Sequence, residues 1–120
     1  MSLLTYILDK EGVPVQEPNI FAWGRWFEET KDRIIQQDTI KTATGDVLVS
    51  TVFLGIDYSF LRGGKPVLFE TMIFESNIKA LHEYQERYRT REQAIKGHSR
   101  AVSLVKSMEL EVPSKEPLNE

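Results

Sequence analysis

The segment from Val47 to Ile56 constrains the fold more than any other part of the sequence, because it is apolar at odd and even positions alike. Successive side chains of a β-strand point to opposite faces of the sheet, and valine, threonine and phenylalanine favour strands. One face would carry Val47, Val49 and Phe53, and the other Leu48, Val52 and Leu54. Such a pattern is typical of a central strand that is covered on both faces.

A second apolar strand is predicted from Val67 to Glu75, after a glycine-containing loop. If the two strands form a hairpin, Thr51 lies opposite Thr71 and Val52 lies opposite Glu70. A slip of one residue would exchange the two faces, so this register is a specific prediction.

Shorter strands are predicted on both sides of this hairpin, at residues 4–8, 13–15, 33–41 and 84–89. The strand at 33–41 contains Gln36, Gln37 and Asp38, and this polarity favours an exposed or edge position.

Two helices are predicted from capping residues and apolar spacing. Asn19 is a suitable N-cap for a helix at 19–32, in which Ile20, Trp23 and Phe27 form an apolar stripe. Thr90 and Gln93 form a capping box at the start of a second helix, which we expect to end near Met108. Its apolar seam consists of Ala94, His98, Ala101, Val105 and Met108.

Together these elements predict an α+β fold, in which an antiparallel sheet of four to five strands has two helices packed on it. The length of 120 residues is typical of one domain, which we place at 1–108, followed by a flexible acidic tail at 109–120. Such a sheet has more apolar face than two helices can hide. We therefore expect a homo-oligomer, a dimer joined through the sheet or through the first helix.

The composition excludes several kinds of chemistry. The chain has no cysteine, which rules out disulfides, thiolate metal sites and a cysteine nucleophile. Its two histidines, His82 and His98, do not have the spacing of a metal-binding pair, and we expect neither a metal nor a cofactor. No apolar run approaches the roughly 18 residues of a membrane span, and no signal sequence is visible, so we expect a cytoplasmic protein without a membrane partner.

Four segments carry a resemblance to known sequences: Trp23–Trp26, Asp46–Asp57, Leu68–Phe74 and Tyr88–His98. In this order they resemble a family of short, uncharacterised proteins encoded by phages and prophages. The resemblance implies an origin in a mobile element and a small accessory role in a bacterial host cell, and it carries over no catalytic residue. This chain departs from the pattern by a longer stretch before Asp46 and by its acidic tail.

Glu70 is an acidic residue within an otherwise apolar strand. Burial of an unpaired carboxylate is costly, so the side chain should be exposed, protonated or paired with an arginine, for which Arg25 and Arg33 are candidates. The alternative is general acid–base catalysis with His98 or Asp57, which would make the protein a small hydrolase or transferase.

His98 lies within the apolar seam of the second helix, which favours a core histidine with one hydrogen-bonded nitrogen over a pH-sensitive or ligand-facing group. Trp26 lies beside the stripe of the first helix and is the better tryptophan for exposure. With Arg25 next to it, an exposed Trp26 would indicate a protein interface, and stacking on a nucleic-acid base is the other use of such a ring.

Arg87 and Arg89 would share one face of the last strand, near Arg91, and this cluster could hold an anion or an acidic partner. Acidic neighbours dilute it, and the net charge of −3 argues against a general nucleic-acid binder. The sequence therefore favours a non-enzymatic accessory protein that binds a host protein or a small molecule as an oligomer. An enzyme that uses Glu70 and a nucleic-acid-binding module remain the alternatives.

Overall fold

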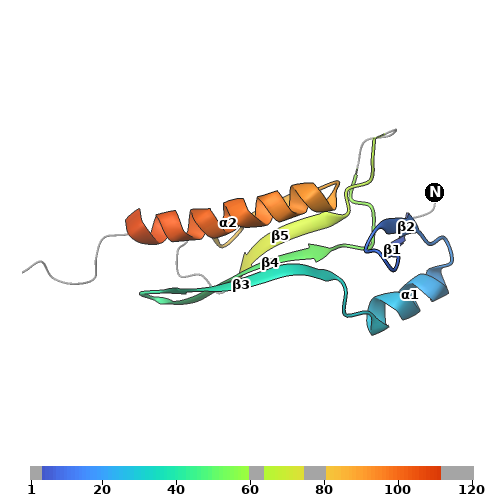
Figure 1. Cartoon of the computed structure of the whole chain (residues 1–120), viewed down its shortest axis with the longest axis horizontal. Helices are drawn as coiled ribbons and strands as arrows, with labels where there is room; N and C mark the ends of the chain where they lie inside the picture. The colour runs from blue at the N-terminus through green and yellow to red at the C-terminus, as the bar shows by residue number, and fades with distance from the viewer. Residues whose placement is uncertain (1–3, 60–63, 75–80, 112–120) are drawn as a thin grey trace, which may run out of the picture.

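The computed structural model describes residues 4–59, 64–74 and 81–111. Figure 1 shows the order of the elements along the chain. The main antiparallel sheet has the strand order β3-β4-β5-β6, and a small antiparallel pair, β1-β2, lies beyond one end of it. The strands are β1 (Tyr6–Leu8), β2 (Pro14–Gln16), β3 (Ile34–Thr42), β4 (Gly45–Phe53), β5 (Phe69–Phe74) and β6 (Gln85–Tyr88), and the helices are α1 (Ile20–Glu29) and α2 (Arg91–Glu111).

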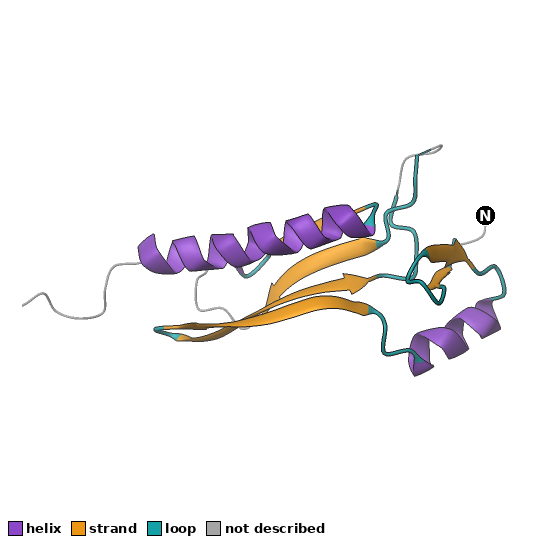
Figure 2. Cartoon of the chain, viewed as in Figure 1, coloured by secondary structure: helices purple, strands orange, loops and turns teal. Residues whose placement is uncertain are grey.

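The predicted α+β fold with an antiparallel sheet and two helices is confirmed. The two helices pack differently, as Figure 2 shows: α2 runs along one face of the main sheet, whereas α1 lies at its end, beside β1. Helix α1 reaches the core of the sheet through Trp26, whose ring packs edge-on against Phe53 with the ring centroids 5.9 Å apart.

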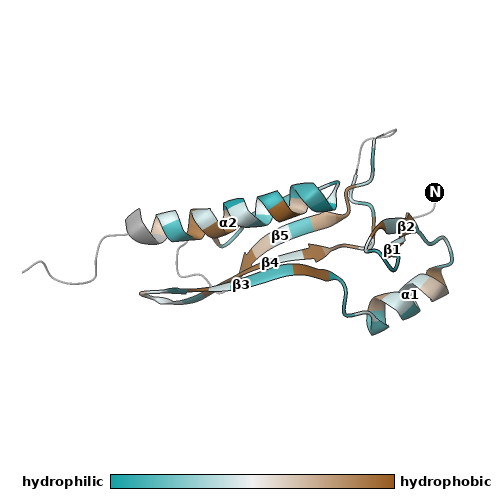
Figure 3. Ribbon diagram, viewed as in Figure 1, coloured by the Kyte–Doolittle hydropathy of each residue, from teal (hydrophilic) through white to brown (hydrophobic). Residues whose placement is uncertain are grey.

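The predicted hairpin register is also confirmed. β4 and β5 pair with Thr51 opposite Thr71 and Val52 opposite Glu70. β3 is an edge strand, as its polarity predicted, and its middle is hydrophilic in Figure 3. This register places both threonines on the face of the sheet that α2 covers.

The predicted helix caps are present. The side chain of Asn19 accepts hydrogen bonds from the backbone N–H groups of Phe21 and Ala22, and Thr90 and Gln93 bond reciprocally. The predicted boundaries need two corrections: α1 ends at Glu29 rather than near residue 32, and α2 runs to Glu111. The tail predicted at 109–120 therefore begins inside a helix, and its residues 112–120 lie outside the described part of the chain.

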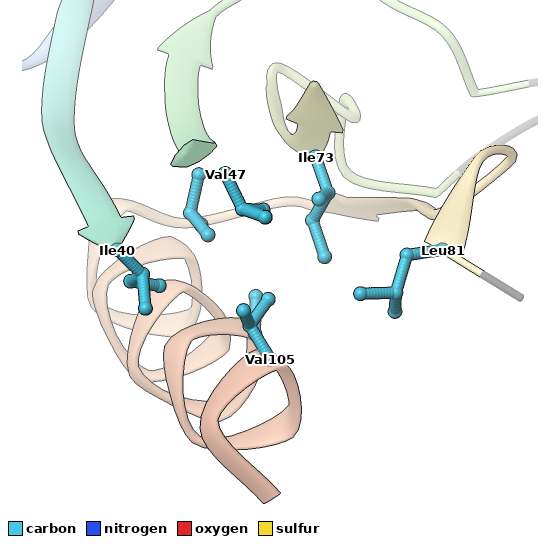
Figure 4. Packing of buried hydrophobic residues seen from close by; sticks show 7 residues of the cluster. Ile40, Val47, Ile73, Leu81 and Val105 are labelled. Carbon is cyan, nitrogen blue, oxygen red and sulfur yellow. The ribbon is translucent and has the colours of Figure 1, made fainter. Parts of the chain in front are cut away.

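The core lies between α2 and the sheet, in two clusters. Figure 4 shows the first, in which Val105 of α2 faces residues from β3, β4, β5 and the segment before β6: Ile40, Val47, Val49, Ile73 and Leu81. The second cluster lies nearer to α1 and contains Leu8, Phe53, Leu68, Phe69, Tyr88 and Ala94. The seam predicted for α2 is buried from Ala94 to Val105.

The opposite face of the main sheet carries no helix among the described residues (Figure 2). The sequence predicts more apolar sheet face than two helices can hide, and in the described part of the chain only one face of the main sheet carries a helix. Leu48, Val52 and Met72 are half-buried on this face, and Phe74 is 41% exposed. One sheet face thus forms the core and the other remains open.

Candidate functional site

A continuous chain of polar side chains crosses the sheet beneath α2. We call this set the polar relay: Asp38 on β3, His98 on α2, Thr51 on β4, Thr71 on β5, and Tyr88 and Glu86 on β6. In this order the successive heavy-atom distances are 2.7, 2.7, 2.5, 3.0 and 3.2 Å. The register of the sheet places Thr51, Thr71 and Glu86 opposite one another on β4, β5 and β6, and the seam of α2 places the imidazole of His98 against Thr51.

The middle of the polar relay is fully buried, since His98, Thr51 and Thr71 are each 0% exposed. Both ring nitrogens of His98 are hydrogen-bonded, Nε2 to Asp38 and Nδ1 to Thr51, so the prediction of a single bonded nitrogen is wrong. Only the two carboxylate ends reach solvent, with the Asp38 and Glu86 side chains 47% and 39% exposed.

An acid, an imidazole and a hydroxyl in this order are also the parts of a hydrolase triad. Catalysis by such a triad needs a hydroxyl that a substrate can reach, together with donors for the developing oxyanion. The Thr51 hydroxyl has no exposed surface, and its oxygen forms a hydrogen bond with the hydroxyl of Thr71. In this geometry the relay holds the sheet and α2 together and offers no nucleophile to a substrate.

The tyrosines at the β6 end of the relay resist deprotonation. Burial, assisted by the Glu86 charge, raises the pKa of Tyr84 to about 12. Burial also raises the pKa of Tyr88, against the opposing effect of its hydrogen bond with Thr71. Both phenols therefore remain hydrogen-bond donors over the whole physiological range of pH.

Glu70 is buried and paired, as predicted, but its partner is neither Arg25 nor Arg33. Arg87 Nε donates to Glu70 Oε2 at 2.9 Å, and the Arg87 guanidinium lies over the ring of Tyr58 at 4.4 Å. Because neighbouring strand residues point to opposite faces, Glu70 lies on the open face while Thr71 joins the relay beneath α2. The sheet thus separates Glu70 from His98, and this does not favour an acid–base pair.

The side chain of Asp57 stabilises the loop in which it lies. Its Oδ1 accepts from the backbone N–H groups of Ser59 and Val67, at 2.7 and 2.9 Å. This arrangement fixes the chain where it leaves and returns to the sheet, which is a common structural use of aspartate in turns.

The arginines in and beside the predicted cluster do not converge on one point. Arg87 binds Glu70, Arg91 donates to the carbonyl of Gly12, and Arg100 pairs with Glu86. The guanidinium of Arg89 lies near Gly64 instead. The structure therefore does not gather these side chains into one anion-binding patch.

A polar cleft of about 300 Å³ lies between the β1–β2 turn, the segment after α1 and the start of α2. It is lined by three acidic and three basic side chains: Asp9, Glu11, Asp32, Lys10, Lys31 and Arg91. The opposing charges balance, so the cleft favours neither an anion nor a cation.

Trp26 is half-buried against Phe53, so it is not the exposed aromatic side chain that we expected. Trp23 is tied down as well, because its Nε1 donates to the carbonyls of Tyr6 and Gly55. The exposed aromatic residue of α1 is Phe21, at 80%, which sequence reasoning missed. Its position outside the stripe of Ile20, Trp23 and Phe27 was the signal that could have identified it.

Exposed apolar side chains concentrate at the end of the molecule that carries α1. Of the eight large hydrophobic residues exposed in the described part of the chain, six lie between residues 4 and 34. We call them the N-terminal apolar set: Leu4, Val13, Val15, Ile20, Phe21 and Ile34. Helix α1 itself has no buried residue, although most of its side chains are apolar. This end of the molecule displays the apolar side chains that a partner could cover.

No protein-family model matches the chain, and no curated protein and no solved structure is similar to it. Within the described residues, no helix is both long and apolar enough to cross a membrane. The same residues contain no group of three or more histidine, aspartate or glutamate side chains arranged to hold a metal ion.

Proposed function

We propose that this chain is a non-enzymatic binding protein that works as a homodimer joined through α1. The observation that carries the proposal is the exposure of the N-terminal apolar set, above all Phe21 at 80% and Ile20 at 49%. Exposed apolar clusters on small domains are typical of interaction sites, and aromatic residues and arginine are enriched where proteins meet. Arg25, exposed on the same helix, fits this composition.

Charge complementarity supports a second copy of the chain as the occupant. Helix α1 carries Arg25 near its middle and Glu28 and Glu29 at its carboxyl end, all three exposed. Two α1 helices that cross antiparallel about a two-fold axis would each bring Arg25 beside the acidic end of the other. Both copies then gain the same ion pair, as the symmetry of an isologous dimer requires.

The resemblance to phage and prophage proteins supports an accessory role in a bacterial host, with a host protein or a small molecule as the further ligand of the dimer. The buried hydroxyl of the polar relay and the pairing of Glu70 with Arg87 both argue against the hydrolase alternative. The dispersal of the arginines argues in the same way against the nucleic-acid alternative.

The test is the molar mass in solution, measured by size-exclusion chromatography with light scattering from low to high micromolar concentration. The wild-type chain should approach twice 13.9 kDa as the concentration rises. Phe21→Ser should remain monomeric, because it removes the most exposed ring of the interface. Ile95→Ser is the matched control, since Ile95 is 43% exposed on α2, outside the proposed interface.

A third variant, Phe74→Ser, separates this proposal from a dimer formed through the open face of the sheet. Phe74 is 41% exposed on that face. If Phe74→Ser dissociates the dimer and Phe21→Ser does not, the interface is the sheet. A wild-type chain that stays monomeric throughout would contradict the proposal altogether.

A further inference from the structure

The polar relay contains more hydrogen-bonding contacts than it has protons to fill when His98 is neutral. Five contacts join its six side chains. The two terminal carboxylates can only accept, so the protons come from one imidazole and three hydroxyl groups. A neutral His98 contributes one proton and the hydroxyls three, which leaves one contact without a hydrogen.

With His98 neutral, four protons fill four of the five contacts, and we place the unfilled one at the longest contact, Tyr88 to Glu86 at 3.2 Å, which gives the relay one direction. Because Asp38 accepts, His98 Nε2 must carry the hydrogen, and Nδ1 must then accept from Thr51. Thr51 in turn accepts from Thr71, which accepts from Tyr88. Tyr88 is within donor distance of both Thr71 and Glu86, at 3.0 and 3.2 Å, but its single hydrogen is used on Thr71 in this arrangement and the contact with Glu86 Oε1 is left unfilled.

Addition of a second proton to His98 reverses the direction in which the hydroxyl groups of the relay donate their hydrogen bonds. We propose that the polar relay is a buried proton-uptake site, in which protonation of His98 Nδ1 turns the three hydroxyl groups and delivers a hydrogen bond to Glu86. Thr51 then accepts from Nδ1 and donates to Thr71, Thr71 donates to Tyr88, and Tyr88 donates to Glu86. One proton enters from solvent and each hydroxyl keeps its own, so all five contacts are filled.

The charges around the relay are consistent with this exchange. On β3, Asp38 faces the ring at 2.7 Å and would balance an imidazolium. β4 and β5 contribute only the uncharged Thr51 and Thr71 at this level. At the β6 end, Glu86 also accepts from Tyr84 at 3.1 Å and from Arg100 of α2 at 2.9 Å. Glu86 is therefore held in place to receive Tyr88 in the protonated state.

The structure offers a matched pair of tyrosines to test the proposal. Tyr84 and Tyr88 both approach Glu86 Oε1, at 3.1 and 3.2 Å, but only Tyr88 also contacts Thr71. Tyr88→Phe therefore interrupts the relay, whereas Tyr84→Phe removes an equivalent phenol outside it. Thr71→Val interrupts the relay in its middle and touches neither carboxylate, and Thr71→Ser restores the hydroxyl.

The measurement is the pH midpoint of His98 protonation, followed by the ¹⁵N chemical shifts of its ring in NMR, with His82→Gln used to assign the two histidines. We expect Tyr88→Phe and Thr71→Val to lower the midpoint by about half a pH unit or more. Each variant removes one more hydrogen bond from the protonated state than from the neutral state, and a shift of this size corresponds to the free energy of one hydrogen bond. Tyr84→Phe should lower it by clearly less, and Thr71→Ser should restore the wild-type value. Equal shifts in the two tyrosine variants, or an unchanged midpoint in Thr71→Val, would overturn the proposal.

Discussion

The two helices of this protein differ in how deeply their side chains are buried. α2 buries its seam from Ala94 to Val105, with Ala94, His98, Ala101 and Val105 at 0% exposure, whereas α1 has no buried residue. Yet α1 is the more apolar of the two in sequence. The burial of each helix depends on the surface against which it packs. α2 lies along four strands, while α1 touches mainly the short β1. The comparison indicates that the sheet and α2 form the packed scaffold, whereas α1 leaves its apolar side chains exposed, and this contrast is the basis of the proposed interface.

The largest difference between the two regions should appear in matched phenylalanine truncations. Phe53 is 0% exposed and contacts the rings of Trp26 and Phe69, so Phe53→Ala should lower the free energy of unfolding by about 3–5 kcal/mol. Urea denaturation followed by circular dichroism measures this loss. A loss below about 1 kcal/mol would mean that the second cluster is not part of a packed core.

The polar relay should give an intermediate effect. Thr51→Val keeps the shape of the side chain but leaves His98 Nδ1 and Thr71 without their shared partner, at a cost of about 1–3 kcal/mol. Thr39→Val is the control, because Thr39 is an exposed threonine on the edge strand β3. If both variants unfold at the same urea concentration, the relay does not contribute to the stability of the scaffold.

The smallest effect should come from the partner-binding end. Phe21→Ala removes a ring that is 80% exposed, so at low micromolar concentration, where the proposed dimer should dissociate, the stability should change by less than about 0.5 kcal/mol. The same denaturation experiment measures it. A loss close to that of Phe53→Ala would show that Phe21 belongs to the core of the monomer and would remove the contrast between the two regions.

Local patterns allowed most of the scaffold to be predicted. The register of β4 and β5 followed from joining the two strands as a hairpin across the intervening loop, with Ile56 placed opposite Pro66, because β4 is apolar on both faces and its pattern alone does not select a pairing. The capping residues Asn19 and Thr90 correctly marked the starts of both helices. These signals are encoded within a few residues, and tertiary contacts did not override them.

The site was harder to predict, because its contacts join residues far apart in the sequence. Nothing in the neighbourhood of Asp38 indicates that its carboxylate lies 2.7 Å from the ring of His98, sixty positions away. Glu70 was correctly predicted to pair, but its partner Arg87 depended on which strand lies beside β5. The exposure of Phe21 depended on how little of α1 the short β1 covers.

The most direct test of a scaffold with a separate partner-binding end is amide hydrogen exchange, measured by mass spectrometry at low and at high protein concentration. Peptides from β4 and α2 should be strongly protected at both concentrations, because the core of the monomer already contains them. Peptides from α1 should exchange quickly in the dilute sample and become protected in the concentrated one. Concentration-dependent protection in β4 and β5 instead, with α1 unchanged, would contradict the account and place the interface on the open face of the sheet.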